Sequence, residues 1–132
     1  MLLAVTLPAV ALDGVVVIAN EAVPLDSLSA AALKDIYTGR TTYWPDGQSI
    51  GIVLQADEMG GETDAALNEV SGMDASQFRT FWQRMVFSGR GQQPRKADDA
   101  ASLVAFVAST RGAIAIVPSN VTLKGVKIIE VR

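Results

Sequence analysis

Short runs of consecutive apolar residues alternate along this chain with longer segments in which apolar residues recur every three or four positions. An unbroken run is typical of a strand buried on both faces of a sheet, whereas the wider spacing is typical of a helix that buries one side. The runs predict strands at residues 15–20, 50–54, 113–118 and 126–131. The spaced segments predict helices between residues 29 and 39, 63 and 72, 74 and 87, and 98 and 112. This order of elements predicts a single α/β domain whose early strands are parallel and joined by right-handed crossovers.

Small polar residues and glycines mark the ends of the predicted helices. The candidate N-caps are Ser29, Asp74 and either Asp98 or Asp99. Asp74 is followed three residues later by Gln77, which is the spacing of a capping box. Gly39 and Gly72 stand where the first two helices are expected to end.

The two tryptophans occupy different kinds of position. Trp82 lies on a complete helical stripe with Phe78 and Met85, so we expect it in the core. Trp44 opens the turn Trp-Pro-Asp-Gly, where the pattern leaves open whether its ring is buried or stacks on a ligand.

The first twelve residues are almost entirely apolar and contain the triplet Ala9-Val10-Ala11, which resembles a signal-peptide cleavage site. The stretch is shorter than the roughly 20 residues that a helix needs to cross a bilayer. Residues 1–12 therefore predict a signal-peptide remnant or an N-terminal arm, followed by one domain at residues 13–132. A signal peptide would make the protein periplasmic or secreted.

Composition narrows the function. Charged residues make up 19% of the chain and the net charge is −3, which offers neither a basic stripe for nucleic acid nor a polybasic patch for lipid. The chain contains no histidine and no cysteine, and so has no thiolate or Ser-His-acid nucleophile and none of the usual zinc ligand sets. Acid-base catalysis would then need carboxylates, for which Asp57, Glu58 and Glu62 form the one candidate cluster in the sequence, but nothing else in the chain resembles a substrate cleft. We expect no catalytic residues, no metal and no cofactor, and a protein that is not an enzyme.

Three segments, spaced in this order, carry a resemblance to a known family. The first contains Leu28-Ser29, Leu33, Ile36-Tyr37, Gly39-Arg40, Trp44 and Asp46-Gly47. The second contains Phe81-Trp82 and Ser88-Gly89-Arg90-Gly91. The third contains Ala105-Phe106-Val107 and Gly112-Ala113-Ile114. Together they resemble the second lobe of the phosphate-type periplasmic solute-binding proteins of ABC transporters, over about residues 15–117. The resemblance implies one three-layer lobe of a type 2 periplasmic-binding-protein fold, with a mixed, mostly parallel sheet flanked by helices.

The resemblance also implies a ligand site. Where the family has an arginine, an aspartate and a Ser-Gly-Thr turn at a helix start, this chain offers Gln55, Asp57, Gly60, Gly61 and Thr63, and the second motif adds Ser88 and Arg90. The additional carboxylates Glu58 and Glu62 would each repel a unit negative charge by ~4 kcal/mol at ~4 Å and an effective dielectric constant of ~20. The glycine pair also fits a flexible turn. The segment 88–96, with the basic residues Arg90, Arg95 and Lys96, fits an exposed, solvated loop.

Two functions follow from a single lobe. One is capture of a small anion or other small solute, with a second copy of the chain or an envelope protein covering the open side of the ligand. The other is a protein-interaction module of an envelope or transport assembly that has kept the fold without a ligand.

Overall fold

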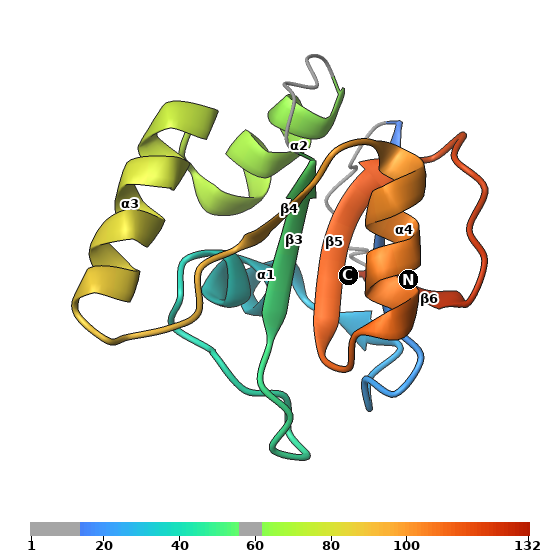
Figure 1. The fold of residues 1–132 in the computed structure, drawn as a ribbon, viewed down its shortest axis with the longest axis horizontal. Coiled ribbons are helices and arrows are strands. Elements are labelled where there is room, and N and C mark those ends of the chain that lie inside the picture. Colours follow the sequence, from blue (N-terminus) through green and yellow to red (C-terminus); the bar gives the residue numbers. More distant parts are fainter. Residues whose placement is uncertain (1–13, 56–61) are drawn as a thin grey trace, which may run out of the picture.

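The computed structural model describes residues 14–55 and 62–132, which form six strands and four helices (Figure 1). The strands are β1 (Val15–Asn20), β2 (Ser27–Leu28), β3 (Gly51–Gln55), β4 (Arg95–Ala97), β5 (Ala113–Pro118) and β6 (Val126–Val131). The helices are α1 (Ala30–Tyr37), α2 (Glu62–Ser71), α3 (Ala75–Phe87) and α4 (Ala100–Ser109). Every predicted strand and helix occurs in the predicted order, and β2 and β4 are additional. The predicted signal peptide or arm at residues 1–12 lies outside the described residues.

All six strands belong to one sheet, in the order β2-β6-β1-β5-β3-β4. β1 runs antiparallel to both of its neighbours, β5 and β6, whereas the pairs β2–β6, β3–β5 and β3–β4 are parallel. The sheet is therefore mixed and mostly parallel, as predicted. The prediction that the early strands are parallel is wrong. β5 lies between β1 and β3 and is antiparallel to β1 but parallel to β3, so β1 and β3 run in opposite directions. A strand buried on both faces carries no side-chain pattern that reveals its direction.

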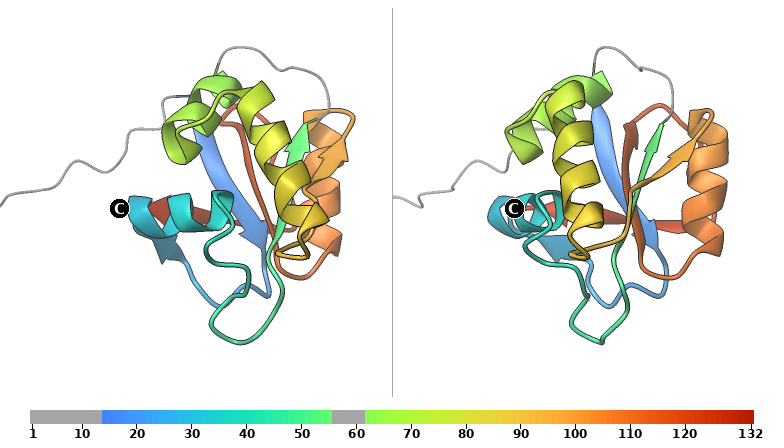
Figure 2. Two further views of the ribbon diagram at one scale, coloured as in Figure 1. Left: turned by 90° about the vertical axis from the view of Figure 1, so that its left-hand side faces the viewer. Right: turned by 60° about the vertical axis from the view of Figure 1, so that its left-hand side comes forward.

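Helices cover both faces of the sheet, which gives the predicted three layers. Figure 2 shows α1, α2 and α3 on one side of the sheet and α4 on the other. Alternate residues of β5 divide between the two cores: Ile114 and Ile116 pack in the core under α1–α3, and Ala113 and Ala115 in the core under α4. The small alanine side chains let α4 lie close to the sheet.

The predicted helix caps are formed. Ser29 Oγ accepts a hydrogen bond of 3.0 Å from the backbone N–H of Ala32 at the start of α1. Asp74 and Gln77 make the reciprocal bonds of a capping box, of 2.8 and 2.9 Å, at the start of α3. Asp99, rather than Asp98, caps α4. No helix in the described part of the chain is long and apolar enough to cross a membrane.

Both tryptophans are buried. Trp82 lies in the core as predicted, and its indole Nε1 donates a hydrogen bond to the backbone oxygen of Tyr37. Trp44 is 3% exposed, and its Nε1 donates to the backbone oxygen of Gly112. The turn at residues 44–47 therefore uses its indole as a structural anchor, and the alternative in which Trp44 stacks on a ligand is wrong.

The segment 88–96, expected to be an exposed loop, ends in part of the sheet. Arg95 and Lys96 are exposed as expected, but they belong to β4, which pairs with β3 in parallel register. So short a strand at the edge of the sheet has no apolar run, which is why the sequence pattern does not reveal it.

Candidate ligand-binding site

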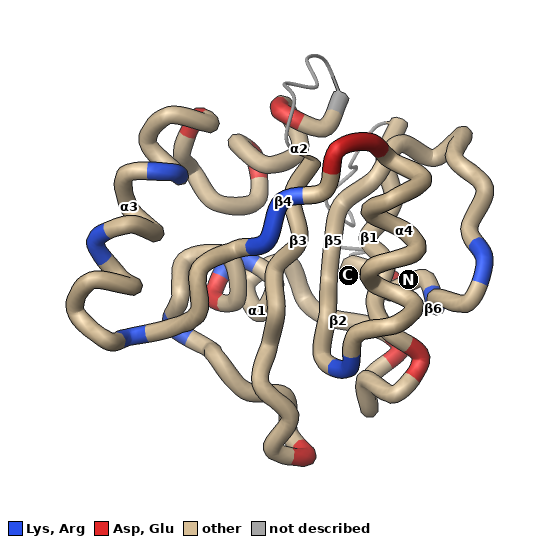
Figure 3. Tube along the Cα trace, viewed as in Figure 1, with Lys and Arg blue, Asp and Glu red and all other residues tan. Residues whose placement is uncertain are grey.

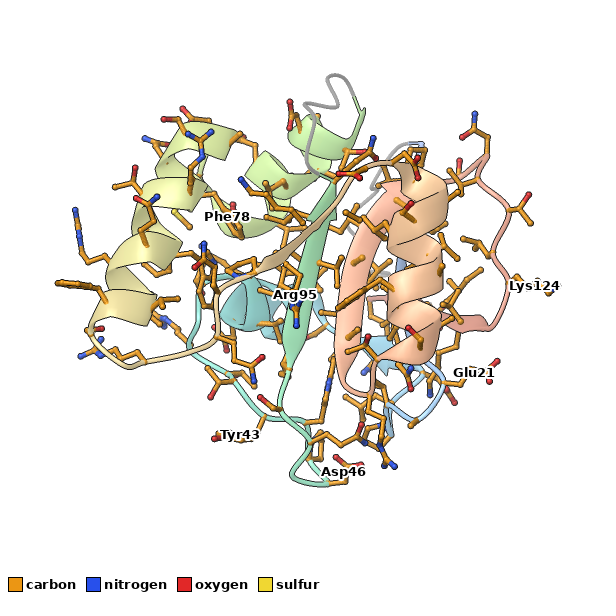
Figure 4. All side chains as sticks on the ribbon, viewed as in Figure 1. Glu21, Tyr43, Asp46, Phe78, Arg95 and Lys124 are labelled. Atoms are coloured by element: carbon orange, nitrogen blue, oxygen red, sulfur yellow. The ribbon has the colours of Figure 1, made fainter. Side chains whose placement is uncertain are left out.

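The described residues enclose a pocket of about 280 Å³ between α2 and α3 on one side and β3 and β4 on the other. We call it the β3 pocket. The apolar part of its wall comes from the helices and the sheet, and includes Tyr37, Leu67, Phe78, Trp82 and Ile116. The polar part includes Gln55, Thr63, Asp64, Arg79, Gln83, Gln93 and Lys96. Figure 4 shows Phe78 between α3 and the sheet.

Two of the predicted site residues meet in the β3 pocket. Gln55 is the last residue of β3, and Thr63 lies in the first turn of α2. Both side chains are half-buried and both line the pocket. Side chains at the carboxyl end of a strand and at the start of the following helix commonly meet in α/β folds, and ligands bind at such edges. Of the other predicted site residues, Asp57, Gly60 and Gly61 lie outside the described residues.

Ser88 and Arg90 lie elsewhere. Because β3 and β4 are parallel, with Val53 opposite Arg95, the segment that precedes β4 lies toward the amino end of β3, whereas Gln55 lies at its carboxyl end. Arg90 lines a separate hollow of about 370 Å³ together with Tyr43 and Ile50, and Trp82 contributes to the walls of both spaces. Ser88 follows α3, where its hydroxyl donates to the backbone oxygen of Met85. The structure does not bring these two residues together with Gln55 and Thr63.

Basic side chains outnumber acidic ones among the described residues of the β3 pocket. Arg79 on α3 and Lys96 on β4 are both exposed, and the described carboxylate in the wall is Asp64. Figure 3 shows basic positions on both of these elements. The ion pair found among the described residues joins Lys127 to Asp26, on another part of the surface. The described charged side chains of this pocket, two cations and one carboxylate, thus carry a net positive charge.

Successive residues of β4 point to opposite faces of the sheet. Lys96 lines the β3 pocket, whereas the guanidinium of Arg95 lies 5.3 Å from the ring centroid of Phe106 on α4. Figure 4 shows Arg95 in front of the sheet. The side chains of these two adjacent basic residues therefore lie on opposite faces of the sheet, which makes the residues a matched pair for mutagenesis.

The sequence pattern does not indicate Tyr37 as a site residue. Its side chain is fully buried, it contributes to the wall of the β3 pocket, and its hydroxyl has no hydrogen-bond partner among the described residues. Burial raises the pKa of the Tyr37 phenol well above its usual range, so the hydroxyl keeps its proton. The available signal was a phenol at a core position of the α1 stripe, where an apolar side chain would serve packing equally well.

Within residues 14–55 and 62–132 there is no group of three or more Asp, Glu, His or Cys side chains that could hold a metal ion. The described polar side chains around the pocket are amides, a hydroxyl, two cations and one carboxylate. Such a set can bind a small solute through hydrogen bonds and charge.

A family model described as the PBP superfamily domain matches residues 6–129. The chain belongs to the PBP superfamily. The sequence has no significant match among curated proteins. The family match and the three-layer fold confirm the resemblance that the sequence motifs carry.

Two solved structures resemble this one in fold. A putative phosphate ABC transporter substrate-binding protein from Clostridium perfringens, solved with bound phosphate, is 23% identical with a TM-score of 0.68 over 90% of this chain and 45% of its own. An ABC-type phosphate transport receptor from Vibrio cholerae is 19% identical with a TM-score of 0.67 over 90% of this chain and 46% of its own. This PBP chain therefore spans less than half the length of those proteins, and the similarity concerns the fold.

Proposed function

We propose that this chain is a solute-binding lobe of a transport system and that it holds a small anionic solute in the β3 pocket. The observation that carries the proposal is the meeting of Gln55, from the end of β3, and Thr63, from the start of α2, in one pocket whose mouth also carries Lys96. Amide and hydroxyl groups orient a solute, and the cation supplies attraction. The PBP family, whose structural relatives include proteins named for phosphate transport, supports the same function.

A lobe of this kind contacts a solute from one side. Ligand sites usually bury most of the surface of what they bind, so a second lobe, a second copy of the chain or an envelope protein would complete the enclosure. In this proposal the protein acts outside the cytoplasm, binds without catalysing a reaction and needs no cofactor.

Isothermal titration with inorganic phosphate, sulfate and phenylphosphonate tests the proposal, with thermal unfolding as a second measurement. A ligand present at 100 times its Kd raises the unfolding free energy by about 2.7 kcal/mol. Lys96→Gln is expected to weaken anion binding about two- to fivefold, as is typical of an exposed charge contact. Arg95→Gln removes the same charge from the neighbouring residue on the other face and is expected to leave binding unchanged.

The variant Arg90→Gln separates the β3 pocket from the hollow beside it. If solute occupies the β3 pocket, this substitution leaves the Kd unchanged, and Thr63→Val raises it. Weaker binding in Arg90→Gln with unaltered binding in Lys96→Gln would move the site to the other hollow. Absence of heat and of thermal stabilisation with all three anions at millimolar concentration would refute solute binding.

A second candidate function is a protein-interaction module. The observation that favours it is the exposure of Phe87, at 95%, at the end of α3, and of Tyr43, at 63%, in the turn before β3. Exposed aromatic side chains are common anchors of protein interfaces. Capture of one stoichiometric envelope protein that is lost in Phe87→Ser and kept in Thr63→Val would support this function over solute capture.

A further inference from the structure

We propose that the exposed end of α3 docks an acidic segment of a partner protein, which places an apolar side chain against Phe87 and carboxylates beside the neighbouring arginines. The docking surface consists of Tyr43, Arg84, Phe87 and Arg90, and we call it the α3-end surface. The inference does not depend on a solute in the β3 pocket. It rests on the second candidate function, protein interaction, and names the class of partner.

The members of the α3-end surface lie on one continuous part of the molecule. Arg84 and Phe87 are three residues apart in α3, so they share a face of the helix. The chain then turns back onto the helix, because the backbone N–H of Arg90 donates a hydrogen bond of 2.9 Å to the backbone oxygen of Met85. Arg90 and Tyr43 line the same hollow of about 370 Å³. The surface therefore extends from the last turn of α3 to the turn before β3.

Two aromatic side chains project from this surface. Phe87 is 95% exposed and Tyr43 is 63% exposed, whereas Trp82 and Met85 of the same helix are buried. The ring of Phe87 thus contributes nothing to the core, and covering it with an apolar side chain is favourable. Aromatic and arginine side chains are the commonest anchors of protein interfaces. The α3-end surface carries both kinds.

Charge is segregated along the chain. Residues 75–97 contain five basic side chains and no acidic one, whereas the remaining residues contain six basic and fourteen acidic side chains. The five basic residues are all exposed: Arg79, Arg84, Arg90, Arg95 and Lys96. Figure 3 shows them along α3 and β4. Within residues 14–55 and 62–132, neither Arg84 nor Arg90 forms an ion pair. The net charge of −3 therefore conceals a basic surface that an acidic partner complements.

The acidic remainder of the chain selects a short acidic segment over a larger polyanion. Exposed charges interact over about 8 Å at physiological ionic strength. A bilayer or a nucleic acid extends beyond the α3-end surface and is repelled by the acidic remainder, whereas a short segment meets the basic surface alone. The hollow between Arg90 and Tyr43 adds Thr41, Thr42 and Gln92, whose side chains can hydrogen bond to a peptide. Two copies of the same basic surface repel each other.

Isothermal titration of the full chain with three peptides of equal length tests the inference. The first contains glutamate and serine, the second has leucine in place of some serines, and the third is the second peptide with lysine in place of glutamate. We expect both acidic peptides to bind, the leucine peptide severalfold more tightly, and the lysine peptide not to bind. Sodium chloride should weaken binding of both acidic peptides.

Matched variants separate the charges from the ring. Arg84→Gln and Arg90→Gln are each expected to weaken both acidic peptides about two- to fivefold, whereas Lys124→Gln, which removes an exposed charge elsewhere, should not. Phe87→Ser should abolish the gain from leucine and leave the glutamate–serine peptide unaffected. Ile128→Ser, at an exposed apolar position on β6, is the control and should keep that gain.

Several outcomes would overturn the acidic partner. Equal binding of the acidic and lysine peptides, or equal losses in Arg84→Gln and Lys124→Gln, removes the role of the charges. Tighter binding to phosphatidylglycerol vesicles or to a single-stranded oligonucleotide than to either acidic peptide assigns the surface to those polyanions. Dimerisation that Phe87→Ser abolishes assigns it to a second copy of the chain.

Failure of the inference is distinct from failure of the functions proposed above. If neither acidic peptide binds at millimolar concentration, the acidic partner is refuted. Protein interaction would still stand if Phe87→Ser abolished capture of one stoichiometric envelope protein. None of these measurements bears on anion binding in the β3 pocket, because Arg84 and Phe87 lie outside its wall.

Discussion

The indole Nε1 of Trp44 donates a hydrogen bond of 2.9 Å to the backbone oxygen of Gly112, although the two residues are 68 positions apart. The same oxygen accepts a bond of 3.0 Å from the backbone N–H of Gly51, the first residue of β3. One carbonyl thus holds the turn before β3 against the residue before β5. This connection fixes the start of the parallel pair β3–β5, at whose other end the β3 pocket lies.

Gly112 is predicted to tolerate no side chain. Its φ is +82°, and an added Cβ would collide with the backbone oxygen of Ser49. We expect Gly112→Ala to lower the unfolding free energy by about 3 kcal/mol or more, from left-handed strain together with overpacking. Gly72→Ala is the matched control, because Gly72 has a φ of +77° and nothing within 4 Å of an added Cβ. Urea denaturation of both should show a much smaller loss for Gly72→Ala, about 1–2 kcal/mol; equal losses would contradict the packing argument.

Position 20 is predicted to require the amide side chain of Asn20. Its Nδ2 donates to the backbone oxygens of Val107 and Ala108, at 2.8 and 3.1 Å, and its Oδ1 accepts from the backbone N–H of Ala22. Asn20→Asp places a carboxylate against the two carbonyl oxygens at the end of α4. At neutral pH we expect this substitution to lower the unfolding free energy by about 3 kcal/mol, because one buried and one partly buried acceptor lose their donor. The loss should shrink as the pH falls and the new carboxyl becomes protonated, which thermal unfolding at pH 7 and pH 4.5 can measure.

The capping box of α3 should contribute more to the unfolding free energy than the surface ion pair does. Asp74→Ala removes the acceptor for the backbone N–H of Gln77 and is expected to cost about 1 kcal/mol. Asp26→Asn breaks the ion pair with Lys127, in which the Asp26 side chain is 93% exposed. The change in unfolding free energy should be close to zero, since exposed ion pairs contribute little to stability. A larger loss for Asp26→Asn than for Asp74→Ala in urea denaturation would reverse this order.

Tyr37 is predicted to limit stability at alkaline pH. Burial raises the pKa of its phenol above the value of about 10 in the unfolded chain. The folded state therefore binds the phenol proton more tightly than the unfolded chain does. The contribution of the protonated Tyr37 to the unfolding free energy is fully present below pH ~10 and is lost progressively as the pH rises above that value. In Tyr43→Phe, where Tyr37 is the remaining tyrosine, ultraviolet absorbance should show no phenol ionisation near pH 10 and then an abrupt rise on unfolding. Reversible ionisation near pH 10 without unfolding would show that the phenol is solvated.

Local signals predicted much of the fold. The period of the apolar residues placed each long strand and each helix, and the side chains of Ser29, Asp74 and Asp99 marked where helices begin. Such features depend on residues within one turn or one run, and can be recognised without the rest of the molecule. The family motifs supplied the type of sheet.

Long-range relationships could not be predicted in the same way. The antiparallel direction of β1 depends on β5 and β6, which follow far along the chain, and β4 exists only because β3 offers it an edge. For the site, motif order placed Gln55 and Thr63 together but gave no distance between Thr63 and Arg90, and the structure puts those two in different hollows. The unpartnered hydroxyl of Tyr37 depends on what surrounds it in three dimensions, which one sequence does not contain.

The position of β1 between β5 and β6 has a consequence for how the protein reaches this structure. Its two partners, β5 and β6, both follow it far along the chain, so a nascent polypeptide stalled before residue 126 leaves one side of β1 without a partner. An apolar strand with an unpaired edge is a template for intermolecular association. Assembly of the sheet around β1 must therefore wait for β6, and sheet closure over such long separations favours folding times of milliseconds to seconds.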